Sequence, residues 1–187
     1  VYIDNNHKID WIADFLRDKK KDSVLIFSRT KHGSDKIVRD LSHKNIKARA
    51  IHGNKSQNAR QLALKEFKDL TTPILVATDI ASRGIDINDL SYVINYDMPE
   101  VSETYVHRIG RTGRAGKSGK AISLVTFSDI SLLKAIEKLI KKSIAEIANR
   151  EYPMVDKTIK VKQQRNNPNQ KRKTQDTKGN VVADIHS

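Results

Sequence analysis

One short segment of the chain combines histidine, arginine and glycine at close spacing. The segment HRIGRTGR runs from His107 to Arg114, with Arg111 near its end and Gly110 and Gly113 beside the arginines. Guanidinium groups present forked donors that suit phosphoryl oxygens, and an arginine brought to a γ-phosphate stabilises the charge that develops during phosphoryl transfer. The glycines would let the chain pack close to a nucleotide bound on another surface. The segment therefore predicts arginines that act on nucleotide phosphates.

The adjoining Gly-Lys-Ser triplet, residues 116–118, resembles the end of a P-loop but does not fit that motif. A P-loop requires a glycine five residues before the second one, and the residue five before Gly116 is Arg111. A P-loop also follows a buried strand and opens a helix. Here the triplet follows a helix-like segment and precedes a strand-like run. We therefore interpret Lys117 and Lys120 as part of a solvated turn.

Polar residues follow two strand-like runs in the first third of the chain. Arg29 and Lys31 come after the apolar run SVLIFS, and Gly53 follows the run IKARAIH. Gln57 and Arg60 would share one face at a helix N-terminus, where backbone amides favour a phosphate. A glycine lets a ligand approach the backbone closely. These residues predict a phosphate-binding surface, although Gln57 and Arg60 also fit ordinary solvated helix positions.

The segment ATDIASRGIDI, residues 77–87, forms a third polar group. Thr78 and Asp79 end a strand-like run, and Gly84 and Asp86 follow in a tight turn. An aspartate after such a turn can accept hydrogen bonds from a ribose hydroxyl. Arg83 in the same segment could have a purely structural role, which would be to pair with Asp79 or Asp86 and hold the turn.

The elements that must position these residues alternate between strand and helix. Apolar runs predict strands at 23–28, 46–52, 73–78, 92–96 and 121–127, and helical periodicity predicts helices at 8–16, 31–44, 57–70, 103–109 and 129–142. Ser56 is expected to cap the third helix, and Ser102 to provide half a capping box for the fourth. This alternation predicts an α/β fold with an open, mostly parallel sheet and helices on both faces. Ligands bind beyond the carboxyl ends of such strands, so the loops after residues 28, 52, 78 and 96 are the expected site.

The overall charge favours a polyanionic partner. The 187 residues include 35 Lys and Arg against 22 Asp and Glu, a net charge of +13, which favours nucleic acid ahead of an anionic membrane.

The absence of cysteine excludes disulfides and Cys-based zinc sites, and no metal site is predicted. No apolar run reaches the roughly 20 residues of a membrane span, and no signal peptide opens the chain. We expect a cytoplasmic protein, and the initial Val1 predicts a fragment of a longer chain.

The C-terminal part of the chain differs from the rest in composition. Residues 160–178 contain seven basic residues against one acid and show no apolar periodicity. Such a segment cannot bury enough surface to offset its ordering entropy. We predict a folded domain over 1–155 and a disordered basic tail over 156–187. The alternative for the tail is a solvated linker without a partner.

Four of these segments together resemble the DEAD-box RNA helicases. HRIGRTGR, ATDIASRGIDI and HGNKSQNAR are similar to motifs VI, V and IVa of that family, and VLIFSRTK is similar to motif IV. Their order and spacing match the second RecA-like domain of the family over roughly residues 20–140. The form HGNKSQ, with Asn54 where most of the family has Asp, and the basic tail resemble the bacterial RhlE-type subgroup.

The resemblance implies a role for each predicted site residue. Arg111 and Arg114 would be arginine fingers, Asp86 with Gly84 would contact the ribose, and His107, which alone would fit a structural histidine, would couple nucleotide to RNA. The residues implied for the RNA backbone are Arg29, Lys31, Gly53, Gln57, Arg60 and Thr78. Contacts to the backbone carry no sequence information, so the implied RNA binding is sequence-independent.

The motifs that are missing imply that the chain is half of a motor. It contains no P-loop, DEAD tetrapeptide, Ser-Ala-Thr motif or glutamine motif, all of which belong to the first RecA-like domain of the family. ATP and Mg²⁺ would be held mainly by that N-terminal domain, and we expect this chain alone to be inactive.

The expected partners of this chain are RNA and that N-terminal domain. Proteins of ribosome assembly or RNA decay are further candidates, because such partners are common for similar bacterial proteins. The rival interpretation is a non-catalytic RNA-binding or protein-docking module that uses the basic tail, and a DNA helicase is disfavoured by the form of HRIGRTGR.

Overall fold

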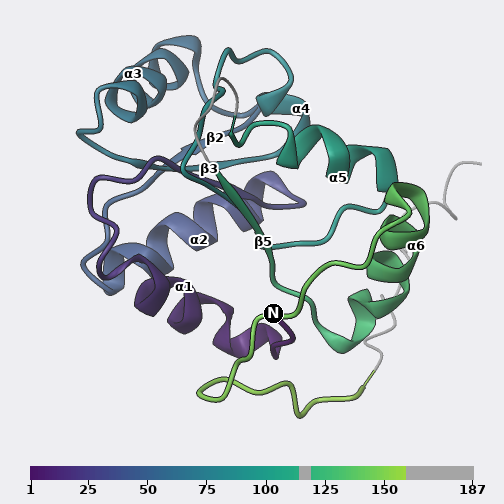
Figure 1. Ribbon diagram of the computed structural model, residues 1–187. Coiled ribbons are helices and arrows are strands. Elements are labelled where there is room, and N and C mark those ends of the chain that lie inside the picture. The colour runs from purple at the N-terminus through teal and green to yellow at the C-terminus, as the bar shows by residue number, and fades with distance from the viewer. Residues whose placement is uncertain (114–118, 159–187) are drawn as a thin grey trace, which may run out of the picture.

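The computed structural model describes residues 1–113 and 119–158. Within these ranges it has five strands and six α-helices (Figure 1). The strands are β1 (Val24–Phe27), β2 (Arg49–Ile51), β3 (Ile74–Ala77), β4 (Tyr92–Asn95) and β5 (Lys120–Ser123). The helices are α1 (Lys8–Leu16), α2 (Lys31–His43), α3 (Gln57–Lys68), α4 (Asp79–Ser82), α5 (Ser102–Ile109) and α6 (Ile130–Ile140), with short 3₁₀ turns at Asn5–His7 and Phe127–Asp129. The predicted α/β fold is confirmed.

The strands form one sheet in the order β2-β3-β1-β4-β5. Every strand pairing that the structure describes is parallel, for example Val24 beside Ile74 on one side and Tyr92 on the other. The chain leaves β1 toward β2, returns through β3, and then crosses β1 to reach β4. Loops therefore leave β1 and β4 in opposite directions, which makes the carboxyl ends of these two strands the topological switch point.

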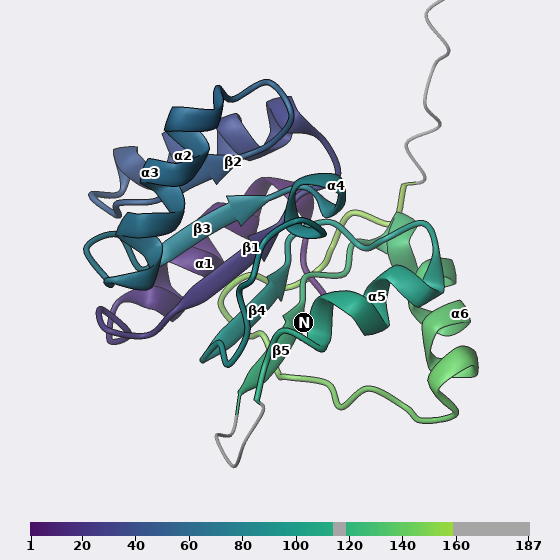
Figure 2. The same cartoon turned by 90° about the horizontal axis from the view of Figure 1, so that it is seen from above.

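Helices cover both faces of the sheet because residues of the central strands alternate between two cores. On one face, Ile12 of α1 and Leu41 of α2 belong to the same buried cluster as Ile26. On the other face, Phe67 of α3 belongs to a cluster with Leu25. Figure 2 shows α3 in front of the sheet and α1 behind it. All four residues of β1 and of β3 are buried, as expected for strands enclosed on both sides.

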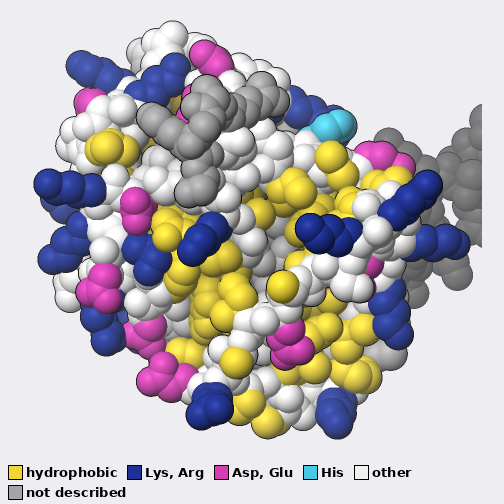
Figure 3. All heavy atoms as spheres, viewed as in Figure 1, with side chains coloured by type: hydrophobic (Ala, Val, Ile, Leu, Met, Phe, Trp, Pro, Cys, Tyr) yellow, Lys and Arg dark blue, Asp and Glu magenta, His cyan; other side chains and the backbone are white. Residues whose placement is uncertain are grey.

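A third core lies beside the sheet, between α5 and α6. Tyr105 of α5 and Leu133 and Ile136 of α6 are buried together with Met98 and Val125, and the two helices lie side by side in Figures 1 and 2. On the face seen in Figure 3, hydrophobic side chains gather at the centre between α1 and α6, and Lys and Arg lie mostly around them. This face is therefore not a continuous basic platform.

Of the two predicted helix caps, at Ser56 and Ser102, the structure contains one. The Ser56 side chain accepts a hydrogen bond from the Ala59 amide at 3.3 Å, so this predicted cap is confirmed. The predicted cap at Ser102 is wrong, because α5 begins at that residue and its N-cap is Val101. A capping box instead precedes α6, where the Thr126 amide donates to the Asp129 carboxylate at 3.2 Å.

The last described residues return to the start of the chain. The backbone amides of Val155 and Asp156 donate to the Asp4 carboxylate at 3.1 and 3.0 Å, and Asn149 donates to the Tyr2 carbonyl at 3.1 Å. Figure 1 shows this segment passing close to the N-terminus.

The boundary at residue 155 stays a prediction, and most of the predicted disordered tail lies outside the described residues. Among the described helices, none is long and apolar enough to cross a membrane.

Candidate functional site

The parallel sheet brings the predicted polar loops to one edge. Arg29 follows β1, Gly53 follows β2, and Thr78 is the N-cap of α4 directly after β3. Because all strands run in the same direction, these loops share the carboxyl edge with the segment after β4. The edge is the expected ligand-binding side of an open α/β sheet.

Arg111 lies against the turn that contains Gly84 and Asp86. Its Nη1 is 3.4 Å from the carbonyl oxygens of Ile85 and Ile87, which flank Asp86 in the chain. The backbone of the two segments is also joined, since the Leu90 amide donates to the Arg111 carbonyl at 3.1 Å. Three residues predicted to contact a nucleotide therefore come together, from segments about 25 residues apart in the chain.

The turn beside Arg111 leaves room for a ligand. Gly84 is exposed, and no heavy atom lies within 4 Å of the position that a Cβ would take. The exposed Asp86 carboxylate accepts a hydrogen bond from Asn88 at 3.0 Å. Asp86 thus keeps acceptor capacity for a sugar hydroxyl, because a carboxylate offers about four lone-pair sites.

Arg108, the first arginine of the segment, has a structural role that the sequence analysis missed. Its guanidinium donates to both carboxylate oxygens of Asp79 at 2.7 and 2.8 Å, to Asn95 Oδ1 at 3.0 Å and to the Asp97 carbonyl at 2.7 Å. The side chain is only 2% exposed and lies over the Phe27 ring at 4.8 Å. Arg108 therefore joins the ends of β3 and β4 to α5.

The sequence contained a signal for this role, which is the spacing of Arg108 from Tyr105. Residues three apart lie on the same face of a helix, and in α5 that face is buried. The alternative that Arg83 holds its turn by pairing with an aspartate is wrong. The structure pairs Asp79 with Arg108 and Asp86 with Asn88, and it leaves Arg83 exposed.

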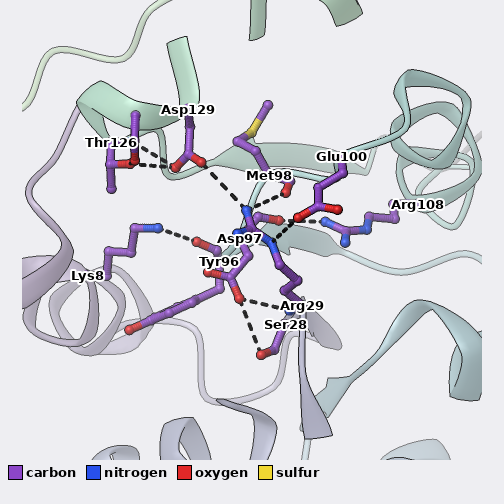
Figure 4. A network of polar contacts seen from close by, with 11 residues as sticks. Lys8, Ser28, Arg29, Tyr96, Asp97, Met98, Glu100, Arg108, Thr126 and Asp129 are labelled. Carbon is purple, nitrogen blue, oxygen red and sulfur yellow. Dashed lines mark hydrogen bonds and ion pairs between the residues drawn. The ribbon is translucent and has the colours of Figure 1, made fainter. Parts of the chain in front are cut away.

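The switch point between β1 and β4 is occupied by a network around Arg29 (Figure 4). The Arg29 amide donates to Asp97 Oδ2 at 2.8 Å, and its guanidinium donates to the Met98 carbonyl at 3.2 Å. The same guanidinium lies 3.7 Å from the Asp129 carboxylate and 3.8 Å from that of Glu100. Arg29 thus joins the loops after β1, β4 and β5, and its contact with RNA stays a prediction.

A buried lysine completes this network. Lys8 is 1% exposed, donates to the Tyr96 carbonyl at 2.6 Å, and lies 5.0 Å from the centre of the Tyr96 ring. Burial lowers the pKa of Lys8, and the nearby carboxylates of Asp97 and Asp129 oppose that shift. Burial also disfavours the charged form of Tyr96, and it therefore raises the pKa of the Tyr96 hydroxyl. Lys8 therefore anchors the N-terminal helix at the same edge.

Side chains of α2 hold the loop that follows β2. Lys31 Nζ donates to Asn54 Oδ1 at 3.0 Å, and Asp35 Oδ1 lies 3.1 Å from His52 Nε2 and 2.9 Å from Lys55 Nζ. Burial acts to raise the pKa of Asp35, but the nearby Lys55 ammonium and His52 ring outweigh it, so the pKa lies below its usual value. The loop is thus fixed at two points on α2.

The other predicted residues differ in how the structure places them. Gln57 is exposed at the first position of α3, and Arg60 is half-buried, with an Nε that has no hydrogen-bond partner among the described residues. His107 is exposed on α5. Arg114 lies outside the described residues. Among those described, no group of three or more His, Cys, Asp or Glu side chains is placed to bind a metal ion.

The fold and this edge define a RecA-like domain, and comparison with known proteins agrees. The family model for the helicase conserved C-terminal domain matches residues 7–116. The DEAD-box ATP-dependent RNA helicase CshA of Bacillus subtilis is 37% identical over 162 residues, which cover 87% of this chain and 32% of the relative. The ATP-dependent RNA helicase DBP2 of Ajellomyces capsulatus is 48% identical over 135 residues, which cover 72% of this chain and 25% of that protein.

Solved structures give the same result. The Escherichia coli DEAD-box protein SrmB, bound to regulator of ribonuclease activity A, superimposes with a TM-score of 0.77 and 35% identity, over 84% of this chain and 95% of that chain. A DEAD-box protein from Methanococcus jannaschii gives a TM-score of 0.72 and 41% identity, over 79% of this chain and 41% of that chain. The chain belongs to the family of helicase conserved C-terminal domains, in its DEAD-box form. It spans between 17% and 32% of the length of eight curated relatives that it matches.

Proposed function

We propose that this chain is the C-terminal half of the motor of an ATP-dependent RNA helicase. The observation that carries the proposal is the position of Arg111 beside the turn of Gly84 and Asp86, at the open edge of the sheet. An arginine at such an edge can reach the phosphates of a nucleotide held mainly by a facing domain. The relatives described as ATP-dependent RNA helicases support this proposal.

In the proposed mechanism, this chain contributes charge and orientation to ATP hydrolysis. Among the described residues, the Arg111 guanidinium makes two long hydrogen bonds of 3.4 Å, so it can exchange the carbonyls of Ile85 and Ile87 for phosphate oxygens. There it would stabilise the charge on the transferred phosphoryl group, together with Arg114. Asp86 would accept hydrogen bonds from the ribose hydroxyls. Mg²⁺ would be held by the N-terminal RecA-like domain.

The RNA surface in this proposal lies on the same edge. The residues proposed to contact the RNA backbone are Arg29, Lys31, Gly53, Gln57, Arg60 and Thr78. Their positions after β1, β2 and β3 and at the start of α3 support a path along the carboxyl ends of these strands. His107, exposed on α5, would couple this path to the nucleotide. Closure of the two domains on ATP and RNA would bend the strand and separate a short duplex locally.

Two finer assignments belong to the same proposal. The RhlE-type subgroup rests on the form HGNKSQ and on the basic tail, whereas the relatives found are of the CshA and DBP2/DDX17 types. A protein partner in RNA decay is supported by the SrmB structure, in which a domain similar to this chain binds a regulator of ribonuclease activity. Ribosome assembly is the alternative pathway for such a partner.

The location of RNA affinity separates this proposal from a non-catalytic module that binds RNA through its tail. We would measure binding of a labelled single-stranded RNA by fluorescence anisotropy over a range of salt concentrations. Arg60→Ala and Thr78→Ala should each weaken binding in the intact chain, and Arg39→Ala, an exposed arginine on α2, is the matched control for the charge. The tail-based alternative predicts instead that deletion of residues 156–187 abolishes binding and flattens the salt dependence.

ATP hydrolysis tests the division of labour between the domains. We expect no RNA-stimulated turnover by residues 1–187, and turnover when the first RecA-like domain is present in the same protein. Measurable RNA-stimulated hydrolysis by this chain alone would contradict the assignment of ATP binding to the absent domain.

A further inference from the structure

The exposed Asn54 side chain has a specific partner. Asn54 Oδ1 accepts a hydrogen bond from Lys31 Nζ at 3.0 Å. Lys31 opens α2 directly after β1, whereas Asn54 lies in the loop after β2. In the sheet β3 lies between β1 and β2, so this contact bridges the carboxyl end of β3, where Thr78 is the N-cap of α4.

The loop that carries Asn54 is fixed on a second side. His52 has a side chain only 3% exposed, and its Nε2 lies 3.1 Å from Asp35 Oδ1. Lys55 Nζ lies 2.9 Å from the same oxygen, and the Lys55 amide donates to the His52 carbonyl at 3.0 Å. Asn54 therefore projects from a short turn that is held at His52 and at Lys55, which gives its amide a defined position.

The two lysines of this region differ in the charge of their partners. Lys55 is paired with the carboxylate of Asp35, so its charge is largely balanced. Lys31 is held by a neutral amide oxygen, which orients the ammonium but leaves its charge uncompensated at this contact. An aspartate at position 54 would accept the same hydrogen bond and would also cancel the charge.

We propose that Asn54 is a positioning residue for RNA binding, which directs the Lys31 ammonium toward the RNA backbone without neutralising it. The inference rests on the proposed RNA surface at the carboxyl edge. It gives this chain a stronger electrostatic hold on RNA at this loop than an aspartate would allow. The charge of Lys31 then contributes to affinity and to its salt dependence, and not to sequence preference.

A double-mutant cycle tests this assignment in the full 187-residue chain. The variants are Asn54→Asp, Lys31→Gln and the double variant, and the probe is a short labelled single-stranded RNA titrated at several salt concentrations. Asn45→Asp is the matched control, because it makes the same change of net charge at the opposite end of α2. We expect Asn54→Asp to weaken RNA binding about fivefold at low salt, and to reduce the slope of log affinity against log salt by about 0.7.

In the Lys31→Gln background, Asn54→Asp should change affinity by less than about twofold, because the charge it cancels is already absent. Thermal unfolding midpoints of the Lys31 and Asn54 variants should agree with that of the wild type, since both side chains are exposed. Equal effects of Asn54→Asp and Asn45→Asp would overturn the inference, as would an undiminished effect of Asn54→Asp without Lys31. If the wild-type chain does not bind this RNA at all, the proposed RNA surface itself fails, and this inference fails with it.

Discussion

At the scale of single residues, the arginines of one short segment have different surroundings. Arg108 is buried and makes four hydrogen bonds to Asp79, Asn95 and Asp97. Arg111, three residues later, is half-buried, and its guanidinium makes two long ones to residues within 1–113 and 119–158. A fully bonded guanidinium stabilises the fold, whereas a weakly bonded one at an open edge can be redirected to a ligand.

The structural role of Arg108 predicts a large loss of stability on substitution. Arg108→Leu should lower the free energy of unfolding by about 3 kcal/mol, because it leaves the Asp79 carboxylate and Asn95 Oδ1 without the Arg108 guanidinium. Urea denaturation followed by circular dichroism measures this change. Arg83→Leu, at an exposed position in the neighbouring turn, should change it by less than about 0.5 kcal/mol. Equal stability of the two variants would show that the Arg108 network does not hold the fold.

The contact of Asp35 with Lys55 and His52 predicts a pH-dependent contribution to stability. The pKa of Asp35 is lowered in the folded chain, so its contribution is present above the unfolded-state pKa of about 3.9 and is lost as pH falls through the folded value. Asp35→Asn should therefore destabilise the chain at neutral pH by up to about 1 kcal/mol, since the side chain is 46% exposed.

The difference between wild type and Asp35→Asn should disappear in acid, below the lowered pKa. Thermal unfolding at a series of pH values gives the measurement, with Asp18→Asn in an exposed turn as the control for net charge. A difference that stays constant from neutral pH into acid would mean that the carboxylate charge is not what holds the loop.

At the scale of elements, periodicity predicted the helices and strands to within a few residues. Apolar runs such as 73–78 mark β3, and the stripe of 8–16 matches α1, because burial in a covered parallel sheet requires these patterns. The four-residue helix α4 was not predicted, since it is too short to show a period, and Asp79 opens this helix where it was expected to end a strand. The cap at Ser102 failed because a serine signals a helix start without fixing which residue begins it.

The order of the strands and the partners across the edge could not be predicted from the sequence. The sheet places β1 at the centre and β2 at the rim, and local patterns carry no information about that order. Arg108 meets Asp79 across 29 residues of chain, and Arg29 meets Asp97 across 68 residues. Such contacts depend on topology, so the sequence indicated which loops form the site but not which of their polar groups bind one another.

Gly119, the residue before β5, packs closely against Leu90 and against Thr112 and Gly113, which follow Arg111. A Cβ on Gly119 would contact the Leu90 carbonyl oxygen and would lie 2.7 Å from the Gly113 nitrogen and from Thr112 Cβ. Gly119→Ala should therefore destabilise the chain by about 1–3 kcal/mol, because backbone atoms must move. Gly84→Ala is the control, since its Cβ would meet open space and stability should be unchanged or slightly higher. Urea midpoints compare them, and a neutral Gly119→Ala would contradict the close packing.

At the scale of the whole molecule, the carboxyl edge has two distinct parts. Between β1 and β4, at the topological switch point, protein groups themselves form the Arg29 network of Figure 4. The exposed turn of Gly84 and Asp86, with Arg111 beside it, and the loop of Asn54 remain open to partners. Under the proposed function, a facing surface would complete a nucleotide site at this open part, as expected for a sequence with clustered arginines but no P-loop.

If Arg111 acts on ATP held by a facing domain, as proposed, RNA-stimulated ATP hydrolysis must depend on this side chain. The measurement uses a protein that contains both RecA-like domains, as wild type, Arg111→Ala and the control Arg39→Ala. We predict that Arg111→Ala lowers turnover by about 10³ or more, that Arg39→Ala leaves it unchanged, and that RNA affinity without nucleotide is the same in all three. Unchanged turnover in Arg111→Ala would contradict the account and would mean that the arginine only supports the turn against which it lies.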